Sequence, residues 1–506
     1  MRLVTPLEMM KLEDLANQSG VTYDIMMDNA GNGLALHIAR IALEQSRNSI
    51  LFLCGNGNNA GDCFVAAAKL AKQFTVTVCM VAGIPKTRTA YTKFRLLKNI
   101  RILTAQDEIR TAVQEAQIIA DGIFGIGFRG ELPPFVRELS AIVAADKEKL
   151  CIGVDIPSGG NGLNGTAAEG IFRCNVTITF GAAKAGLFMS PLSEYCGAIY
   201  LVEIGIPEEA FSQFPYPVTH LAEPEVRSLL PARPKNAHKG MFGTLLTVAG
   251  CRNMPGAAIL AMQAALRTGV GLCCLASEEG VCRMMVSNSP EAIMLPLPTD
   301  NTGKLTPQSI PAILENAKTA TAVLIGCGLG LTDNIRQTVT GLLTQLECPV
   351  ILDADGLNAI ASGIDILRKV KGPVVLTPHP GEMARLMRCT VADIQKDRVA
   401  AAKKLAARFP NTIVVLKGDG TVIATADHAS VNTTGNSGMS KGGSGDVLAG
   451  MIAGLTAQHI PAEDAAKIGV YLHGLAGDCA AAELSRRAML PSDLIRQLPL
   501  LFGEYE

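Results

Sequence analysis

Two glycine-rich segments of this chain carry side chains that can do chemistry, and the later one gives the sharper prediction. Residues 442–446 read Gly-Gly-Ser-Gly-Asp and stand directly before an apolar stretch typical of a buried helix. Backbone amides at such a helix start form a nest that binds anions. Asp446 falls in the first turn, where its carboxylate can take a hydroxyl proton while the nest holds a phosphoryl group. The segment predicts phosphoryl transfer, and a flexible Gly/Ser loop is the alternative.

Two segments that follow predicted strands would supply partners for this nest. Residues 417–421 (Lys-Gly-Asp-Gly-Thr) combine a lysine and a threonine with glycines, which suits contact with an adenine nucleotide. His379 lies between two prolines after the apolar run 374–376, so it is either a ligand contact or a structural residue. The ligand sites of parallel sheets lie at the carboxyl ends of the strands, where these segments would meet. No GxxxxGK[ST] sequence occurs, which excludes a P-loop enzyme.

The earlier glycine-rich segment, residues 55–62, follows the strand-like run 49–54 and precedes a helix predicted over 64–72. Strand, glycine turn and helix in this order are typical of a dinucleotide-binding unit. Such a unit also places an acidic residue about 20 residues further on, at the end of the next strand. Here that strand ends at Cys79, Met80 and Val81. We therefore do not expect an ordinary bound NAD cofactor; a tight turn that only permits close packing is the alternative.

Three strand ends of the N-terminal half offer oxygen ligands, in Asn59, Asp121 and Ser158. Amide, carboxylate and hydroxyl oxygens suit an alkali or alkaline-earth cation and do not suit zinc. A single aspartate at a strand end is more often a turn or cap residue. Three such residues at one edge of a sheet favour a cation site.

The elements that must position these residues are short β-branched runs that alternate with alanine-rich helical stretches. Runs such as 50–53, 152–154, 323–325 and 413–416 are typical of parallel strands that are buried on both faces. The fold class is α/β, and the 506 residues are enough for two large domains or roughly three. Prolines gather between 207 and 234, where we predict a linker and the entry to a second domain.

Composition excludes several classes of protein. The 45 Lys and Arg residues and 46 Asp and Glu residues give a net charge of −1, which argues against a nucleic-acid partner. No stretch approaches the roughly 18 uninterrupted apolar residues of a membrane helix, and the N-terminus does not read as a secretory signal. The 14 cysteines are scattered without a CxxC pair, as expected for buried thiols in a reducing compartment. We expect a cytoplasmic protein that binds neither membranes nor nucleic acid.

Four motifs of the N-terminal half together resemble a known family. They are the glycine-rich segment 55–62, a D-x-x-F-G-x-G loop at 121–127, the V-D-I-P-S-G loop at 154–159 and F-G-x-x-K-x-G-L at 180–187. With them, residues 1–215 resemble the NAD(P)H-hydrate epimerase domain, a Rossmann-like three-layer α/β/α fold. The resemblance implies a potassium ion at Asn59, Asp121 and Ser158. It assigns binding of the hydrated nicotinamide nucleotide to Asn58, Asn59, Ala60, Gly61, Asp62, Gly125, Ile126, Gly127, Phe128, Arg129, Gly130, Glu131 and Asp155.

Epimerisation at the hydrated ring carbon needs acid–base chemistry, for which we choose Asp155 first and Lys184 second. The sequence departs from the family pattern at Ala60 and Cys63, where the family has glycines, and at 160–165, a stretch of equal length that lacks the family's carboxylates. If residue 60 required a positive φ, the alanine would cost about 1–2 kcal/mol.

After a linker at 216–235, residues 236–506 resemble the NAD(P)H-hydrate dehydratase domain of the ribokinase-like superfamily, another α/β/α fold. The motifs include Gly-Cys-Gly-Leu-Gly at 326–330, where Cys327 replaces the family's proline, Asp-Ala-Asp at 353–355 and Thr-Pro-His-Pro-Gly-Glu at 377–382. The resemblance implies ADP as co-substrate, a magnesium ion, and Asp446 as the catalytic base. It assigns hydrate binding to Ala258, Gly328, His379 and Asp446, and adenine-nucleotide binding to Lys417, Gly418, Asp419, Gly420, Thr421 and Gly445.

The resemblances together imply an enzyme that repairs hydrated NADH and NADPH. The N-terminal domain would interconvert the R and S hydrates, and the C-terminal domain would dehydrate the S form with ADP, releasing AMP and phosphate. The family tends to form homo-oligomers. Two alternatives stay open: a ribokinase-like small-molecule kinase, and an N-terminal domain that binds nucleotide or serves as a scaffold without catalysis.

Overall fold

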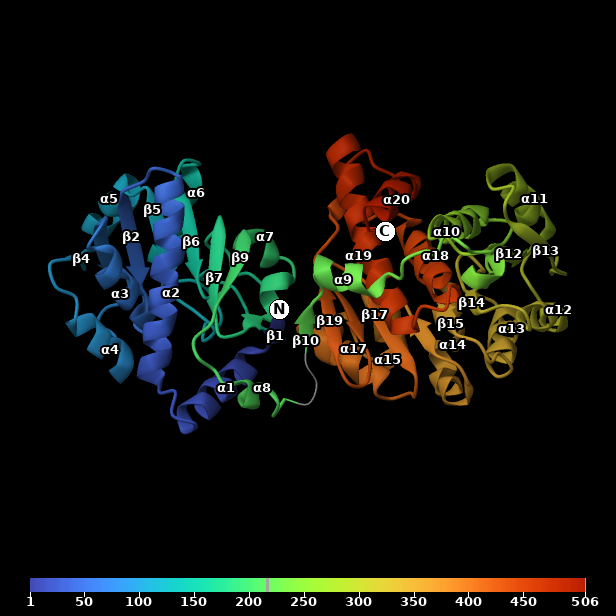
Figure 1. Cartoon of the computed structure of the whole chain (residues 1–506), viewed down its shortest axis with the longest axis horizontal. Helices are drawn as coiled ribbons and strands as arrows, with labels where there is room; N and C mark the ends of the chain where they lie inside the picture. The colour runs from blue at the N-terminus through green and yellow to red at the C-terminus, as the bar shows by residue number, and fades with distance from the viewer. Residues whose placement is uncertain (215–217, 506) are drawn as a thin grey trace. The chain divides into compact units, whose positions relative to one another are not determined.

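The structure, a computed structural model, describes residues 1–214 and 218–505. The chain divides into two compact units, Met1–Val218 and Thr219–Glu506, each with helices and strands of its own (Figure 1). The predicted end of the N-terminal domain at 215 and the predicted start of the linker at 216 lie outside the described residues. Within the predicted linker, α9 (Glu223–Leu229) belongs to the second unit, where its Val226 is fully buried.

A parallel sheet forms the centre of the first unit, because its strands are apolar on both faces. In β2 (Ser49–Cys54), Phe52 enters the core on one face of the sheet, whereas Leu51 and Leu53 enter the core on the other. The strand order reverses between β2 and β5, which makes the gap between their carboxyl ends the topological switch point. The sheet runs in the order β4 (Arg101–Leu103), β3 (Thr75–Met80), β2, β5 (Ile118–Gly122), β6 (Leu150–Val154), β7 (Val176–Phe180) and β9 (Ala198–Val202).

Helices cover both faces of this sheet, which confirms the predicted Rossmann-like α/β/α layers. The core on one side takes in α1 (Pro6–Gln18), α2 (Tyr23–Glu44) and α3 (Asn58–Leu70), and the other takes in α5 (Gln106–Glu115) and α6 (Pro134–Ala145). Thr5 and Glu8 form a capping box that fixes the start of α1. The remaining elements are β1 (Arg2–Val4), α4 (Arg88–Arg95), β8 (Ala183–Lys184), η1 (Ala185–Phe188), α7 (Ser193–Cys196) and α8 (Glu208–Phe211).

The predicted start of the helix after the first glycine-rich segment was wrong. We predicted helix over 64–72, and α3 begins at Asn58, directly after the extended Gly57. The segment looks like a loop in sequence because it is rich in Asn and Gly, but its second half is the first turn of the helix. Ala60 therefore has a helical backbone and avoids the cost of a positive φ.

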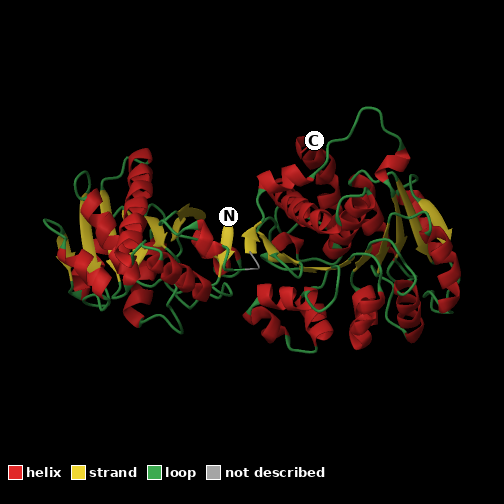
Figure 2. Ribbon diagram, turned by 60° about the horizontal axis from the view of Figure 1, so that its bottom comes forward, coloured by secondary structure: helices red, strands yellow, loops and turns green. Residues whose placement is uncertain are grey.

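A mixed sheet forms the second unit, with helices on both faces (Figure 2). Its strands are parallel from β13 to β17, and β17, β18 and β19 are antiparallel. The order is β13 (Ile293–Pro296), β12 (Leu272–Ser277), β11 (Thr244–Val248), β14 (Ala322–Ile325), β15 (Val350–Leu352), β16 (Val374–Leu376), β17 (Thr412–Leu416), β18 (Thr421–Ala424), β19 (Ala429–Asn432) and β10 (Val218–His220).

One apolar core of the second unit holds α10 (Pro255–Arg267), α18 (Ser444–Ala457), α19 (Ala462–Leu484) and α20 (Pro491–Tyr505). Among the described residues, no helix has the length and apolar character needed to span a bilayer. The remaining elements are η2 (Lys239–Phe242), α11 (Glu279–Asn288), η3 (Pro307–Ser309), α12 (Ile310–Ala317), α13 (Asp333–Leu343), α14 (Asp355–Ile360), η4 (Ala361–Lys369), α15 (Pro380–Met387), α16 (Val391–Lys396), α17 (Arg398–Ala406) and η5 (Ser437–Met439).

The switch point of the first unit generates a stability prediction at Gly55. A Cβ atom at Gly55 would lie 2.0 Å from the Ile123 carbonyl oxygen, so Gly55→Ala must push the ends of β2 and β5 apart. We expect a loss of about 1–3 kcal/mol, which speeds amide exchange in both strands roughly 5- to 150-fold. Gly57→Ala is the matched control, because a Cβ there meets nothing within 4 Å. Equal exchange in the two variants, measured by hydrogen–deuterium exchange of the full chain, would contradict this account.

Candidate functional sites

A cavity of about 600 Å³ opens at the carboxyl ends of β2, β5 and β6 in the first unit. The predicted residues that line it are Asn58, Asn59, Asp62, Gly125, Ile126, Gly127, Phe128, Asp155 and Lys184. Ala60 and Gly61 are buried behind it in α3, and Arg129, Gly130 and Glu131 are exposed beyond it. Asp121 and Ser158 are fully buried beside it.

A buried ion pair forms part of the cavity wall. Lys184 Nζ donates to Asp155 Oδ1 at 2.6 Å, and it also donates to Thr179 Oγ1 at 3.2 Å and to the Phe180 carbonyl at 3.1 Å. Asp155 directly follows β6 with a φ of 67°, a conformation that costs of order 1–3 kcal/mol for a residue other than glycine. The surroundings hold Asp155 in this conformation, which keeps its carboxylate against the ammonium group.

The three predicted cation ligands lie around one loop. Ser158 donates twice to Asp121, from its hydroxyl at 2.5 Å and from its backbone amide at 2.7 Å. Asn59 donates its amide to the Val154 carbonyl at 3.1 Å, which leaves its Oδ1 available beside Gly125. Burial raises the pKa of Asp121 to about 6, although the Ser158 donors lower it. A buried carboxylate with neutral oxygens around it fits an alkali cation, whose charge would stabilise the ionised form.

Two further carboxyl groups line the same cavity, and the sequence pointed to only one of them. Asp62, in α3, has its pKa raised well above the usual value by burial and then by Asp155 and Glu13. Glu13 enters from α1, and burial raises its pKa to about 7, with Lys184 lowering it and Asp155 raising it. We did not predict Glu13, because a glutamate on an amphipathic helix reads as a solvent-exposed residue.

The second unit also places a lysine and carboxylates at the carboxyl ends of its strands. Lys417 Nζ lies 2.7 Å from Asp353 Oδ1 and 4.0 Å from Glu382 Oε2. Asp353 follows β15, Glu382 lies in the first turn of α15, and both are buried. Burial raises the pKa of Glu382 to about 7, which Lys417 partly offsets. In the sequence, Asp353 and Glu382 stand out only as parts of motifs, and the structure adds them to the site as partners of Lys417.

Asp446 lies next to this pair, in the first turn of α18, the helix that the sequence predicts after the glycine-rich segment. The backbone of its neighbour Gly445 approaches so closely that a Cβ there would lie 3.3 Å from Lys417 Nζ. Burial raises the pKa of Asp446 to about 6, and nearby Asp353 raises it further. A hydrogen bond from the Cys327 thiol and the charge of Lys417 act in the opposite direction.

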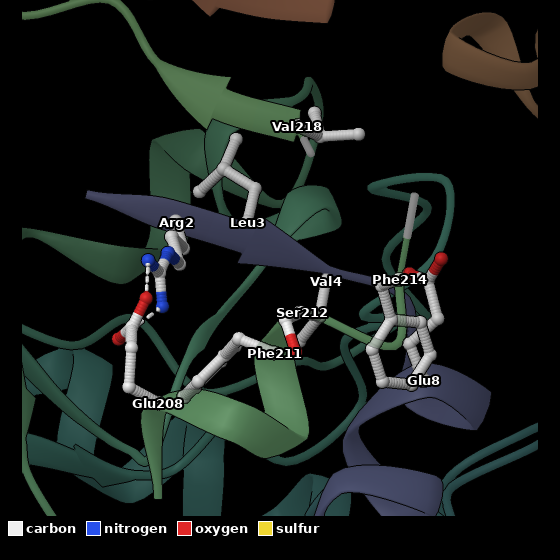
Figure 3. Close-up of a pocket in the computed structure, with 9 residues that line it drawn as sticks. All are labelled: Arg2, Leu3, Val4, Glu8, Glu208, Phe211, Ser212, Phe214 and Val218. Carbon is white, nitrogen blue, oxygen red and sulfur yellow. Dashed lines mark hydrogen bonds and ion pairs between the residues drawn. The ribbon is translucent and has the colours of Figure 1, made fainter. Parts of the chain in front are cut away.

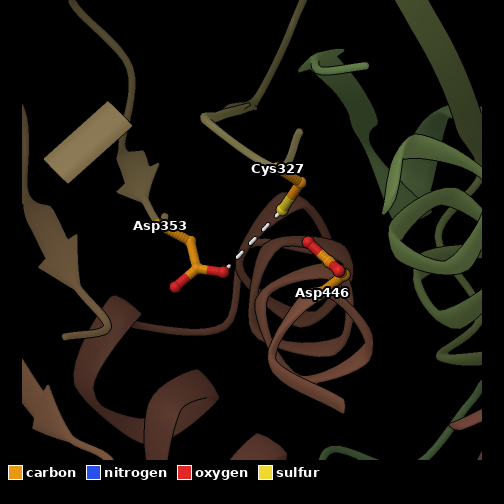
Figure 4. Close-up of side chains that lie close together, drawn as sticks. All are labelled: Cys327, Asp353 and Asp446. Carbon is orange, nitrogen blue, oxygen red and sulfur yellow. Dashed lines mark hydrogen bonds between the residues drawn. The ribbon is translucent and has the colours of Figure 1, made fainter. Parts of the chain in front are cut away.

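Cys327, Asp353 and Asp446 converge from three separate elements (Figure 4). Their ligand atoms lie within 4.8 Å of one another, and Cys327 Sγ is 3.9 Å from Asp353 Oδ2. Sulfur is a poor ligand for magnesium, and Lys417 already occupies one Asp353 oxygen. The donor set therefore fits a magnesium ion only through the two carboxylates, with substrate phosphates supplying the remaining oxygens.

The other predicted residues of the second unit surround this centre. His379 caps α15 and is half exposed, with its Nδ1 accepting from the Gly381 amide at 3.0 Å. Burial lowers the His379 pKa, and Lys417 and Arg385 lower it further, which favours the neutral ring. Ala258 is fully buried in α10, and Gly328 lies against the start of that helix. Gly418, Asp419, Gly420 and Thr421 connect β17 to β18 and open β18, with the Thr421 hydroxyl donating to the Gly418 carbonyl at 2.8 Å.

A smaller cavity of about 220 Å³ in the first unit lies between β1 and α8 (Figure 3). Arg2 bridges it, paired with Glu208 and placed 4.7 Å from the centre of the Phe211 ring. None of the predicted site residues lines this cavity.

Comparisons with known proteins cover both units. Residues 245–500 match the family described as NAD(P)H-hydrate dehydratase, and residues 23–186 match the YjeF-related protein N-terminus. A bifunctional NAD(P)H-hydrate repair enzyme (Nnr) of Moorella thermoacetica is 36% identical over 521 residues, which cover 100% of this chain and 97% of that protein.

Two solved structures resemble the second unit. The ADP/ATP-dependent NAD(P)H-hydrate dehydratase of Bacillus subtilis, co-crystallised with ATP and Mg²⁺, is 37% identical with a TM-score of 0.50, over 57% of this chain and 99% of that one. A ribokinase-like superfamily protein of Enterococcus faecalis is 28% identical with a TM-score of 0.51, over 57% of this chain and 96% of that one. The predicted ribokinase-like fold of the second unit is confirmed.

The ion pair of the first unit can be tested by stability alone. Asp155→Asn keeps a residue that tolerates positive φ but leaves the Lys184 ammonium buried without its counter-charge. We expect a loss of about 3–5 kcal/mol, because a buried charge without a partner is costly. Asp146→Asn is the control, since its pair with Lys149 is 3.5 Å long and Asp146 is half exposed. Urea unfolding of the full chain, followed by exchange of β6 amides, measures both; similar losses would refute the structural role of the pair.

Proposed function

The chain belongs to the bifunctional NAD(P)H-hydrate repair enzymes, and from this premise we propose how its two sites divide the work. The family combines an epimerase and a dehydratase. We assign interconversion of the R and S hydrates to the first cavity and ADP-dependent dehydration of the S hydrate to the Asp446 centre. The observation that carries this assignment is the carboxylate–lysine pair that each unit builds at the carboxyl ends of its strands.

In the first unit, we propose that Asn58, Asp62 and residues 125–128, which line the cavity together with Asp155, hold the hydrated nucleotide, and that the exposed residues 129–131 contact its outer part. The Asp155 carboxyl group, oriented by Lys184, gives a proton to the departing ring hydroxyl or accepts one from the incoming water. Asn59, Asp121 and Ser158 would hold a potassium ion beside the loop, where its charge stabilises the buried Asp121 carboxylate.

In the second unit, Asp446 takes the proton of the ring hydroxyl, and that oxygen attacks the terminal phosphoryl group of ADP, with AMP as leaving group. Backbone amides at the start of α18 hold the transferred phosphoryl group, and Lys417 offsets its charge. The C–O bond to phosphate then breaks and the neighbouring ring carbon loses a proton, which restores the ring double bond and yields NAD(P)H and phosphate. A magnesium ion would neutralise the phosphate charges.

We further propose that the protein works in the cytoplasm as a homo-oligomer on small-molecule substrates only. The scattered cysteines and the balanced charge support the compartment and the lack of a nucleic-acid partner, and the family resemblance supports assembly. The alternative function is a small-molecule kinase with a non-catalytic first unit. Asp446 and the backbone amides at the start of α18 would also suit an enzyme that phosphorylates an alcohol and releases the phosphorylated product. The two functions differ in their product, inorganic phosphate against a phosphorylated metabolite.

The decisive experiment follows absorbance as reduced nicotinamide reappears from a mixture of both hydrates with ADP and magnesium. Wild type should recover all of it, Asp446→Asn should lower the rate about 10²- to 10⁴-fold, and Asp121→Ala should slow only the second phase. Asp427→Asn, an exposed carboxyl on the β18–β19 turn, is the matched control.

Spontaneous epimerisation makes the rate of the second phase, and not its endpoint, the measured quantity. Failure of wild type with both ADP and ATP, or a stable phosphorylated product, would overturn the dehydratase assignment in favour of a kinase. A second phase no faster than the enzyme-free rate would mean that the first unit binds without catalysing.

The thiol of Cys327 gives a prediction about pH. Asp446 must be ionised to act as a base, so the dehydration rate falls as pH drops through its pKa of about 6. The thiol hydrogen bond lowers that pKa, so Cys327→Ala should raise it and move the acid limb of the rate profile to higher pH. Cys327→Ser keeps a donor and should leave the limb near its wild-type position. An unmoved limb in the alanine variant would show that the thiol does not tune Asp446.

A further inference from the structure

The chemistry of epimerisation asks for two proton-transfer groups, whereas the proposed mechanism so far uses one. The hydrate carries its hydroxyl on a ring carbon bonded to the ring nitrogen. When the nitrogen lone pair forms a C=N bond, the C–O bond breaks and the hydroxyl takes a proton and leaves as water. Water then adds to the other face, its C–O bond forms as the π electrons return to nitrogen, and its extra proton passes to a base. Inversion therefore needs an acid at one face and a base at the other, as in other inverting reactions at such carbons.

The Asp155–Lys184 pair can serve only one of these faces. Both side chains come from the carboxyl edge of the sheet, after β6 and from β8. Lys184 Nζ donates its three hydrogen bonds to Asp155, Thr179 and the Phe180 carbonyl, at distances of 2.6 to 3.2 Å. The second group must come from another wall of the cavity.

Helix α1 supplies a carboxyl group at that wall. Met10 and Glu13 line the cavity from α1, an element that belongs to neither the sheet edge nor the glycine-rich segment. Among the described residues, Glu13 has no hydrogen-bond partner, so its carboxyl oxygens remain available to a bound molecule. The fixed start of α1, capped by Thr5 and Glu8, holds the helix and thereby the side chain in place.

We propose that Glu13 is the second acid–base residue of the first cavity, acting on the face of the hydrated ring opposite the Asp155–Lys184 pair. This inference rests on the proposed epimerase function. It names a residue that exchanges roles with Asp155: one protonates the departing hydroxyl, and the other accepts the proton of the incoming water. Reaction in the opposite direction reverses the two roles.

The charged groups around Glu13 support this role. Lys184 and Asp155 face it from the sheet edge, Asp62 from α3, Asp14 from its own helix and Tyr23 from α2. Burial outweighs the lysine and raises the Glu13 pKa to about 7, so both protonation states are populated near neutral pH. Asp62 is a weaker candidate, because it lies on α3, whereas Glu13 lies on a separate helix, and because burial raises its pKa well above the ordinary value.

The test follows conversion of one purified hydrate epimer into the other by chromatography, using the full chain without ADP so that dehydration is silent. Glu13→Gln should lower kcat about 10²- to 10⁴-fold with little change in KM, and should remove the ionisation near pH 7 from the rate profile. Glu13→Asp should recover part of the rate. Glu115→Gln, an exposed glutamate at the end of α5, is the matched control.

Loss of activity in Glu13→Gln would not reflect loss of folding. A neutral glutamine avoids the burial cost of the ionised glutamate, so the unfolding midpoint should not fall. An active wild type together with a Glu13→Gln variant of unchanged rate and pH profile would overturn the inference and leave the proposed function intact. Loss of the pH 7 ionisation in Asp62→Asn and not in Glu13→Gln would do the same. A wild type no faster than the enzyme-free rate would overturn the epimerase function itself.

Discussion

A buried carboxylate–lysine pair at the carboxyl ends of parallel strands is the interaction on which both units depend. Lys184 holds Asp155 at 2.6 Å in the first unit, and Lys417 holds Asp353 at 2.7 Å in the second. Neither partner can be buried alone, since an unpaired charge in such a place costs several kcal/mol. The pairs therefore fix the strand ends and the loops that follow them. These two contacts thereby help to position the loops proposed to bind substrate.

The same pairs explain why other carboxyl groups nearby have a pKa close to neutrality. Burial is the largest cause in both cases. For Glu13 the attraction of Lys184 exceeds the repulsion of Asp155, whereas for Asp446 the repulsion of Asp353 exceeds the attraction of Lys417. Glu13 reaches about 7 beside the first pair, and Asp446 reaches about 6 beside the second. A carboxyl group with a pKa near neutrality can both give and accept a proton at physiological pH, which is what acid–base catalysis requires.

Sequence alone predicted the parts of both sites that lie at strand ends. Apolar runs followed by glycine or aspartate reveal such loops. Ser158 donates to Asp121, and Asn59 donates to the Val154 carbonyl at the end of β6, because parallel strands end at one edge of a sheet. The sequence did not identify Glu13 and Glu382 as site residues. Each lies on a helix whose pattern looks amphipathic and whose packing partner is distant in sequence. The start of α3 at Asn58 was predicted too late in the chain, because the first turn of this helix is rich in Asn and Gly and resembles a loop in sequence.

The departures from the family pattern lie behind the first cavity and not in it. Ala60 faces the core from α3 with an ordinary helical backbone. Cys63 is fully buried, and its sulfur lies so close to Gly122 that a Cβ at that glycine would be 2.2 Å away, so the larger side chain at 63 is matched by the bare backbone of β5. In the loop 160–165, the Gly162 carbonyl accepts from the Gly186 amide at 2.9 Å and backs the segment that carries Lys184. These changes alter what supports the charged groups of the cavity while leaving those groups in place, so they give no physical reason for the first unit to have lost catalysis.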